Sequence, residues 1–215
     1  ICREDMESKK IWPDAFIVRE LSRIPSNFRC DASIQEILAE YDVPGIAGID
    51  TRALTKILRE KGTMNGCITT NADYVMEEIQ KRLKAYDMGN VVDIVTCQEK
   101  YTLKGTRELS ENGPLSGSAR YTGEKEKRPS LVKELNGKGK RVALLDLGAK
   151  DNIARSLAAR GCDVTVYPAR TSAQEILSDK PDGIMLSNGP GDPKVCTKVI
   201  ENVKKLYESD TPIFA

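Results

Sequence analysis

The stretch with the clearest potential for chemistry is LSNGPGDP, Leu186 to Pro193, which follows the apolar run PDGIM. Gly189 and Gly191 lack a Cβ, so they can adopt positive φ and let a ligand approach the main chain. Pro190 fixes its own φ and biases Gly189 toward extended backbone. The segment could thus aim a backbone N–H of Gly189 or Gly191 at a carboxylate or an oxyanion. On these residues alone, a plain strand-to-helix turn is the favoured interpretation.

A second candidate is DLGAKDN, which also follows an apolar run. It has one glycine, Gly148, and matches neither a dinucleotide-binding fingerprint nor a phosphate-binding loop. Asp146 and Lys150 could pair or bind a polar group, but structural roles at a strand end are favoured. Asp146, Asp151 and Asp192 could form a receiver-like metal site, an interpretation weakened by their spread over different loops.

Other polar residues have simpler roles. Asp50 in GIDTRALT is expected to cap a helix, and Arg52 to lie on a surface or interface. Six cysteines are scattered without a C-x-x-C pair, which argues against a zinc site or a disulfide framework. The 215 residues include no histidine, so a Ser-His or Cys-His mechanism cannot be complete within them.

Composition indicates a globular protein with 40% hydrophobic and 30% charged residues. A net charge of +1 gives no electrostatic case for binding nucleic acid or an anionic membrane. No apolar run approaches the roughly 20 residues of a spanning helix, and no signal peptide is visible. We expect a reducing, cytoplasmic setting. The missing initiator methionine predicts a fragment or a processed chain.

Residues 1–103 form the first predicted domain. An extended segment is expected at IWPDAFIVREL, and a helix at DASIQEILAEYD, with Ser33 and Glu36 as its capping box. VPGIAGID and NGCITT are predicted strands. Helices are expected from Asp50 to a glycine cap at Gly62, and from Asn71 onward. Residues 104–140 lose this periodicity and are predicted to form a linker or exposed loops.

Residues 141–215 form the second predicted domain. Strands are expected at RVALLDLG, DVTVYP, GIMLSN and TPIFA, and helices at KDNIARSLAARG, SAQEILSDK and PKVCTKVIENVKKLYESD. This β-α-β-α-β-α-β order with continuous apolar strands predicts an α/β fold with a doubly wound parallel sheet. Ligands of such sheets bind outside the carboxyl ends of the strands, where DLGAKDN and SNGPGDP both lie.

Three stretches, in order, resemble the small subunit of glutamine-dependent carbamoyl phosphate synthase: EDMESKKIWPDAFIVRELSRIPSNF, IDTRALTKILREKGTMNGCI, and DLGAKDN through NGPGDP. The resemblance implies an N-terminal α+β domain followed by a class I glutaminase domain. It implies glutamine hydrolysis through a cysteinyl thioester, with Gly189 and Gly191 at the glutamine and oxyanion site. The implied partner is a large subunit that holds ATP and Mg²⁺ and makes carbamoyl phosphate for pyrimidine and arginine biosynthesis. No cofactor is expected in this chain.

The resemblance also implies what these residues lack. The family's nucleophilic Cys and its His and Glu are expected beyond Ala215, and a β-rich segment before Ile1. Cys196, inside a predicted helix, does not occupy the nucleophile's position. The chain is therefore expected to be an internal fragment, truncated in both domains and inactive alone.

Three other functions stay open. The chain could act only as a non-catalytic binding or assembly module. It could be another class I amidotransferase, such as one serving anthranilate or guanylate synthesis, although the IDTRALTKILREKG region argues against this. The βα pattern would also allow a flavodoxin-like or receiver domain.

Overall fold

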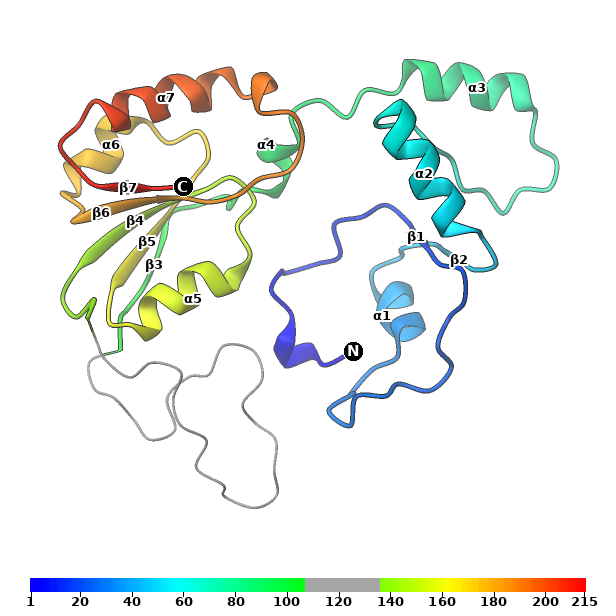
Figure 1. The fold of residues 1–215 in the computed structure, drawn as a ribbon, viewed down its shortest axis with the longest axis horizontal. Coiled ribbons are helices and arrows are strands. Elements are labelled where there is room, and N and C mark those ends of the chain that lie inside the picture. The colour runs from blue at the N-terminus through cyan, green and yellow to red at the C-terminus, as the bar shows by residue number, and fades with distance from the viewer. Residues whose placement is uncertain (107–135) are drawn as a thin grey trace. The chain divides into compact units, whose positions relative to one another are not determined.

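The computed structural model describes residues 1–106 and 136–215, which form two compact units, Ile1–Met88 and Gly89–Ala215 (Figure 1). The boundary lies earlier than the predicted domain end at residue 103. Residues 89–103 belong to the second unit because they supply a helix and a strand to its sheet layer. Of the predicted linker, residues 107–135 lie outside the described residues. No helix in either described range has both the length and the apolar character to cross a membrane.

The first unit contains short elements joined by long loops. They are η1 (Arg3–Asp5), β1 (Phe16–Ile17), α1 (Ile34–Glu40), β2 (Gly45–Ile46), α2 (Thr51–Lys61) and α3 (Met76–Ala85). β1 and β2 form a two-stranded parallel pair. Buried side chains of α1 are Ile37 and Leu38, whereas α2 and α3 bury none.

Local signals in this unit correctly predicted two helix starts. Ser33 and Glu36 form the full capping box, and the Asp50 side chain accepts hydrogen bonds from the backbone N–H groups of Arg52 and Ala53. Two predictions are wrong. NGCITT forms no strand, and α3 begins at Met76 because Asn71 instead accepts a hydrogen bond from the Asp73 N–H in a local turn.

The second unit is built on a five-stranded sheet in the order β3-β5-β4-β6-β7. Its elements are α4 (Val91–Val95), β3 (Tyr101–Leu103), β4 (Arg141–Asp146), α5 (Asp151–Ala159), β5 (Asp163–Pro168), α6 (Ala173–Ser178), β6 (Gly183–Leu186), η2 (Pro193–Val195), α7 (Thr197–Tyr207) and β7 (Ile213–Phe214). The pairs among β5, β4, β6 and β7 are parallel, which confirms the predicted α/β fold. β3 adds an antiparallel edge strand that the sequence did not predict.

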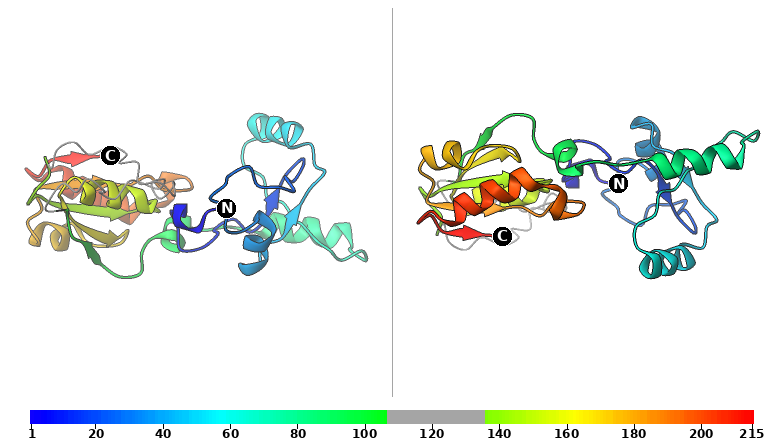
Figure 2. Two further views of the ribbon diagram at one scale, coloured as in Figure 1. Left: turned by 90° about the horizontal axis from the view of Figure 1, so that it is seen from below. Right: turned by 90° about the horizontal axis from the view of Figure 1, so that it is seen from above.

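Helices cover both faces of this sheet. Views from below and from above show α5 in front of the sheet in one and α7 in front in the other (Figure 2). Side chains alternate along β4, because successive residues of a strand face opposite sides. Leu144 packs in the core beneath α5, whereas Ala143 and Leu145 pack in the core shared with α6 and α7.

The strand order fixes where a ligand would bind. After β4 the chain passes to β5 on one side and then crosses to β6 on the other. The chain that follows β4 leads to α5 on one face of the sheet, whereas the chain that follows β6 leads to α7 on the other face. Crevices at such switch points are where open α/β sheets bind ligands.

Candidate functional site

The switch point brings together the two segments singled out in the sequence. Strands β4 and β6 pair with Leu145 opposite Leu186, so residues 147–149 and residues 187–191 emerge side by side. Ser187 joins them, because its hydroxyl oxygen accepts a hydrogen bond from the Leu147 N–H at 2.9 Å and donates one to the Asn188 carbonyl at 2.8 Å. Ser187 is buried. The two loops thus form one local structure.

Gly189 is needed because the two loops touch. A Cβ built on Gly189 would lie 2.4 Å from the Leu147 carbonyl oxygen, a separation that side chains do not adopt. Its φ is not positive. A glycine is therefore needed at this position to make room for the main chain of Leu147, and not to allow the positive φ that the sequence analysis considered.

Gly191 has the other property expected of a loop glycine. Its φ is 84°, in the left-handed region that disfavours other residues. A Cβ at this position would lie 3.9 Å from Cγ2 of Val91, so the restriction comes from the backbone and not from crowding.

The loop leaves backbone donors available. Residues 188–191 are exposed, and within the described ranges neither the Gly189 N–H nor the Gly191 N–H donates a hydrogen bond to another group. Both N–H groups are therefore free to donate to a ligand, and binding of a carboxylate or an oxyanion there stays a prediction.

Asp146 has a structural role at the end of β4. One carboxylate oxygen accepts hydrogen bonds from the Gly148 and Ala149 N–H groups, at 2.9 and 2.7 Å. The other accepts one from the Cys97 N–H at 2.7 Å. With these donors and an exposure of only 7%, the Asp146 side chain holds the loop in shape and is not available to a ligand in the crevice.

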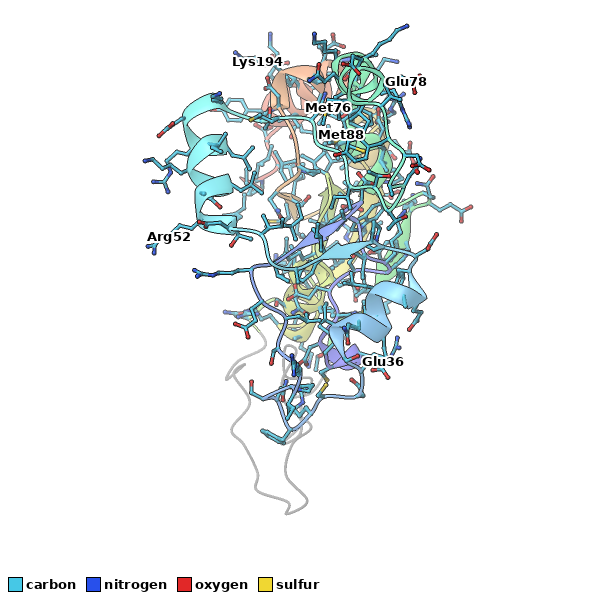
Figure 3. All side chains as sticks on the ribbon, turned by 90° about the vertical axis from the view of Figure 1, so that its right-hand side faces the viewer. Glu36, Arg52, Met76, Glu78, Met88 and Lys194 are labelled. Atoms are coloured by element: carbon cyan, nitrogen blue, oxygen red, sulfur yellow. The ribbon has the colours of Figure 1, made fainter. Side chains whose placement is uncertain are left out.

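The other carboxylates of the proposed receiver-like site stay apart. Asp151 pairs with Arg155 at 3.0 Å, and Asp192 accepts a hydrogen bond from the Lys194 N–H at the start of η2. No group of three metal-ligating residues occurs in the described part of the chain. In the first unit, Arg52 extends away from α2 (Figure 3), as expected of an exposed arginine.

Sequence reasoning missed α4, which packs at the same strand ends. Cγ2 of Val95 lies 2.8 Å from the position of a Cβ on Gly148. The Thr96 hydroxyl donates a hydrogen bond to the Asp146 carbonyl at 2.7 Å and accepts one from the Ala169 N–H at 2.8 Å. The only available signal was Asn90 before an apolar run, which is a helix N-cap pattern.

Neither cysteine near the loops is set up as a nucleophile. Burial, and then the nearby Asp146, raise the pKa of the Cys97 thiol from 9.0 to about 12, so it stays protonated at neutral pH. Cys196 is buried, and its thiol donates to Oδ1 of Asn90 at 3.3 Å. The geometry thus presents a backbone donor site without an attacking group.

Similarity to known proteins extends over nearly the whole chain. Residues 1–68 match the family model for the carbamoyl-phosphate synthase small chain, CPSase domain, and residues 143–215 match that for class-I glutamine amidotransferases. The chain is 41% identical to the carbamoyl phosphate synthase small chain of Neisseria gonorrhoeae over 98% of its own length and 52% of that protein. It is 39% identical to that of Clostridium perfringens over 94% of its length and 49% of the relative.

The chain thus resembles carbamoyl phosphate synthase small chains along nearly its whole length. It spans about half the length of the curated relatives it matches. The resemblance found in the sequence is confirmed, and the small-chain match over residues 1–68 disfavours amidotransferases of other pathways. The class-I amidotransferase match begins within β4 and includes β7, so it covers both loops of the site.

Proposed function

We propose that these residues belong to the glutamine-hydrolysing subunit of a carbamoyl phosphate synthase. The observation that carries this proposal is the pair of exposed, available N–H groups at Gly189 and Gly191, at the switch point of a class-I amidotransferase sheet. The small-chain match over residues 1–68 selects carbamoyl phosphate synthesis among the pathways that such sheets serve.

The proposed role of the loop is to bind glutamine and stabilise an oxyanion. A thiolate attacks the side-chain amide carbon of glutamine, and the carbonyl oxygen becomes negatively charged. N–H donors aimed at that oxygen stabilise the transition state more than the ground state. Collapse of the intermediate expels ammonia, after protonation, and leaves a thioester that water hydrolyses to glutamate.

Glutamine hydrolysis also needs a nucleophilic thiol and a base, and the two loops supply neither. The 215 residues contain no histidine, and of the two cysteines beside the loops Cys196 is buried and Cys97 is partly buried. We assign the nucleophile and its base to residues outside this sequence, so the present chain is expected to release no ammonia from glutamine by itself. The ammonia would pass to a large subunit that holds ATP and Mg²⁺.

A glycine substitution in the full-length protein, assayed with its large subunit, tests the loop. Gly191→Val places a β-branched residue at φ 84° and should displace the donor. Loss of one oxyanion donor lowers the rate by about 10² to 10³-fold, so glutamine-dependent synthesis should fall by that factor. Synthesis from added ammonia should persist, because ammonia bypasses the hydrolysis.

Gly139→Val is the matched control. Gly139 has a φ of 79° and open space around it, and it precedes β4 at the opposite end of the sheet. This variant carries the same backbone strain but should keep its use of glutamine. Equal glutamine kinetics for the two variants would reduce the Gly191 loop to a turn.

A non-catalytic assembly module is the second candidate for these 215 residues. The absence of histidine favours it for the chain taken alone. Co-purification with the large subunit, without glutaminase turnover, would support assembly as the chain's own activity. Release of ammonia from glutamine by the isolated chain would contradict that view.

A further inference from the structure

Residues 90–97, here called the α4 strap, contact both loops of the site. At its first end, Oδ1 of Asn90 accepts hydrogen bonds from the Val92 N–H at 3.2 Å and from the Cys196 thiol at 3.3 Å. Val91 faces Gly191, with Cγ2 at 3.9 Å from the position of a Cβ on that glycine. The strap therefore touches the chain on both sides of η2, at Gly191 in the Gly-Pro-Gly turn before it and at Cys196 after it.

The other end of the strap holds the loop after β4. Val95 packs against Gly148, the Cys97 N–H donates to the Asp146 carboxylate, and the Thr96 hydroxyl donates to the Asp146 carbonyl. Thr96 also accepts from the Ala169 N–H, which belongs to the chain after β5. One hydroxyl thus links the ends of two neighbouring strands.

A third tie comes from charge. The Arg170 side chain donates to both oxygens of Asp93, through Nε at 2.6 Å and through Nη2. The Arg170 guanidinium lowers the pKa of the Asp93 carboxyl. The strap is therefore joined to the chain that follows β4, β5 and β6, whereas residues 188–191 are themselves exposed.

We propose that the α4 strap is a positioning element that fixes the loops after β4 and β6 relative to each other, and so aims the Gly189 and Gly191 donors. This inference rests on the proposed function, because it assigns the strap's effect to glutamine use. Strap residues act through the loops and not on the substrate. Reaction geometry is sensitive to such positioning, since a displacement of about 1 Å can lower a rate by about 10²-fold.

Thr96→Val tests the strap in the full-length protein with its large subunit. Valine keeps the shape of threonine but removes both hydrogen bonds of the hydroxyl. We expect kcat/KM for glutamine to fall by about tenfold or more. Thr96→Ser, which restores the hydroxyl, should bring it back to within about twofold of wild type, a recovery that loss of packing alone would not produce.

Thr165→Val is the matched control. Thr165 lies within β5 and its hydroxyl shares a hydrogen bond with that of Thr102 at 3.1 Å, away from both loops. It loses the same chemical group from the same sheet, and its glutamine kinetics should match wild type. Equal kcat/KM for Thr96→Val and Thr165→Val would overturn the proposal.

A second measurement separates this inference from the proposed function. Hydrogen exchange at the hydrogen-bonded amides of the two loops, those of Leu147, Gly148, Ala149 and Ser187, should be faster in Thr96→Val than in Thr165→Val, whether or not the protein hydrolyses glutamine. Unchanged exchange would overturn positioning by the strap, whereas absent turnover in the wild type would overturn only the glutaminase role. Should Thr96→Val fold poorly, Val91→Ala gives the same comparison at the Gly191 end.

Discussion

Single residues at the site meet different physical demands that look alike in the sequence. Gly191 requires a left-handed backbone, whereas Gly189 requires room for the Leu147 carbonyl oxygen. The sequence predicted both glycines as site residues but could not separate these two reasons, because the second depends on a residue more than forty positions away. The buried Ser187 that joins the two loops gave no sequence signal.

The environment of Cys97 predicts a slow-reacting thiol. Burial and Asp146 raise its pKa to about 12, so little thiolate forms at pH 8. Iodoacetamide should therefore alkylate the exposed Cys67 well before Cys97 in the folded chain, as followed by peptide mass spectrometry. In denaturant the two cysteines should react at similar rates, and fast alkylation of folded Cys97 would contradict its raised pKa.

The same thiol contributes a pH dependence of stability. The unfolded thiol titrates near its ordinary value of 9.0 and the folded one near 12, so the unfolded state loses its proton first. The free energy of unfolding should therefore decline as pH rises from about 9 toward 12. Cys97→Ala should show a shallower decline than the wild type in urea titrations over this range.

Helices and strands of six or more residues in the second unit were predictable from the sequence, whereas its shorter elements β3 and α4 were not. The apolar runs of β4 and β5 and the apolar face of α5 fill six or more residues each and repeat their period clearly. β3 has three residues and α4 has five, which is too few to display a period. NGCITT was expected to be a strand, yet it has no partner strand among the described residues.

The candidate site divides in the same way. Its loops follow from the strand-end rule for parallel sheets, which needs only the order of the elements. The contribution of α4 depends on tertiary contacts between residues 49 and 106 positions apart in the sequence. Pro193 was expected to begin the last long helix, but it begins η2, and α7 starts at Thr197 because the backbone of Cys196 interrupts the helix with a φ of −87° and ψ of 47°.

Helix α6 is predicted to depend on one side chain for its attachment. Ile176 is fully buried in the core shared with α7, whereas Gln174 on the same helix is exposed. Ile176→Ala removes buried methyl groups and should lower the free energy of unfolding by about 2–5 kcal/mol. Gln174→Ala should change it by less than about 0.5 kcal/mol in the same urea titration, followed by circular dichroism. Similar midpoints for both would show that α6 contributes little to the core.

Across the whole molecule, the division into units has a consequence for function. The strap and β3 precede the long segment 107–135 in sequence, yet they complete the sheet that follows it. A split at residue 103, as the sequence suggested, would separate the strap from the loops it contacts. The unit that carries the class-I amidotransferase match therefore begins, in structural terms, at Gly89.

Two shortened chains test that boundary. A chain of residues 89–215 keeps the cross-strand pairs of β3, the burial of Val92, and the donors that the strap supplies to Asp146. A chain of residues 104–215 loses all of these and leaves the edge of β5 unpaired. Burial of one valine and pairing of a buried carboxylate together contribute at least about 3 kcal/mol, so the shorter chain should unfold at markedly lower urea. It should also associate more readily through its open edge, as measured by light scattering. Equal urea midpoints for the two chains would return the boundary to residue 103 and leave the strap as an appendage of the first unit.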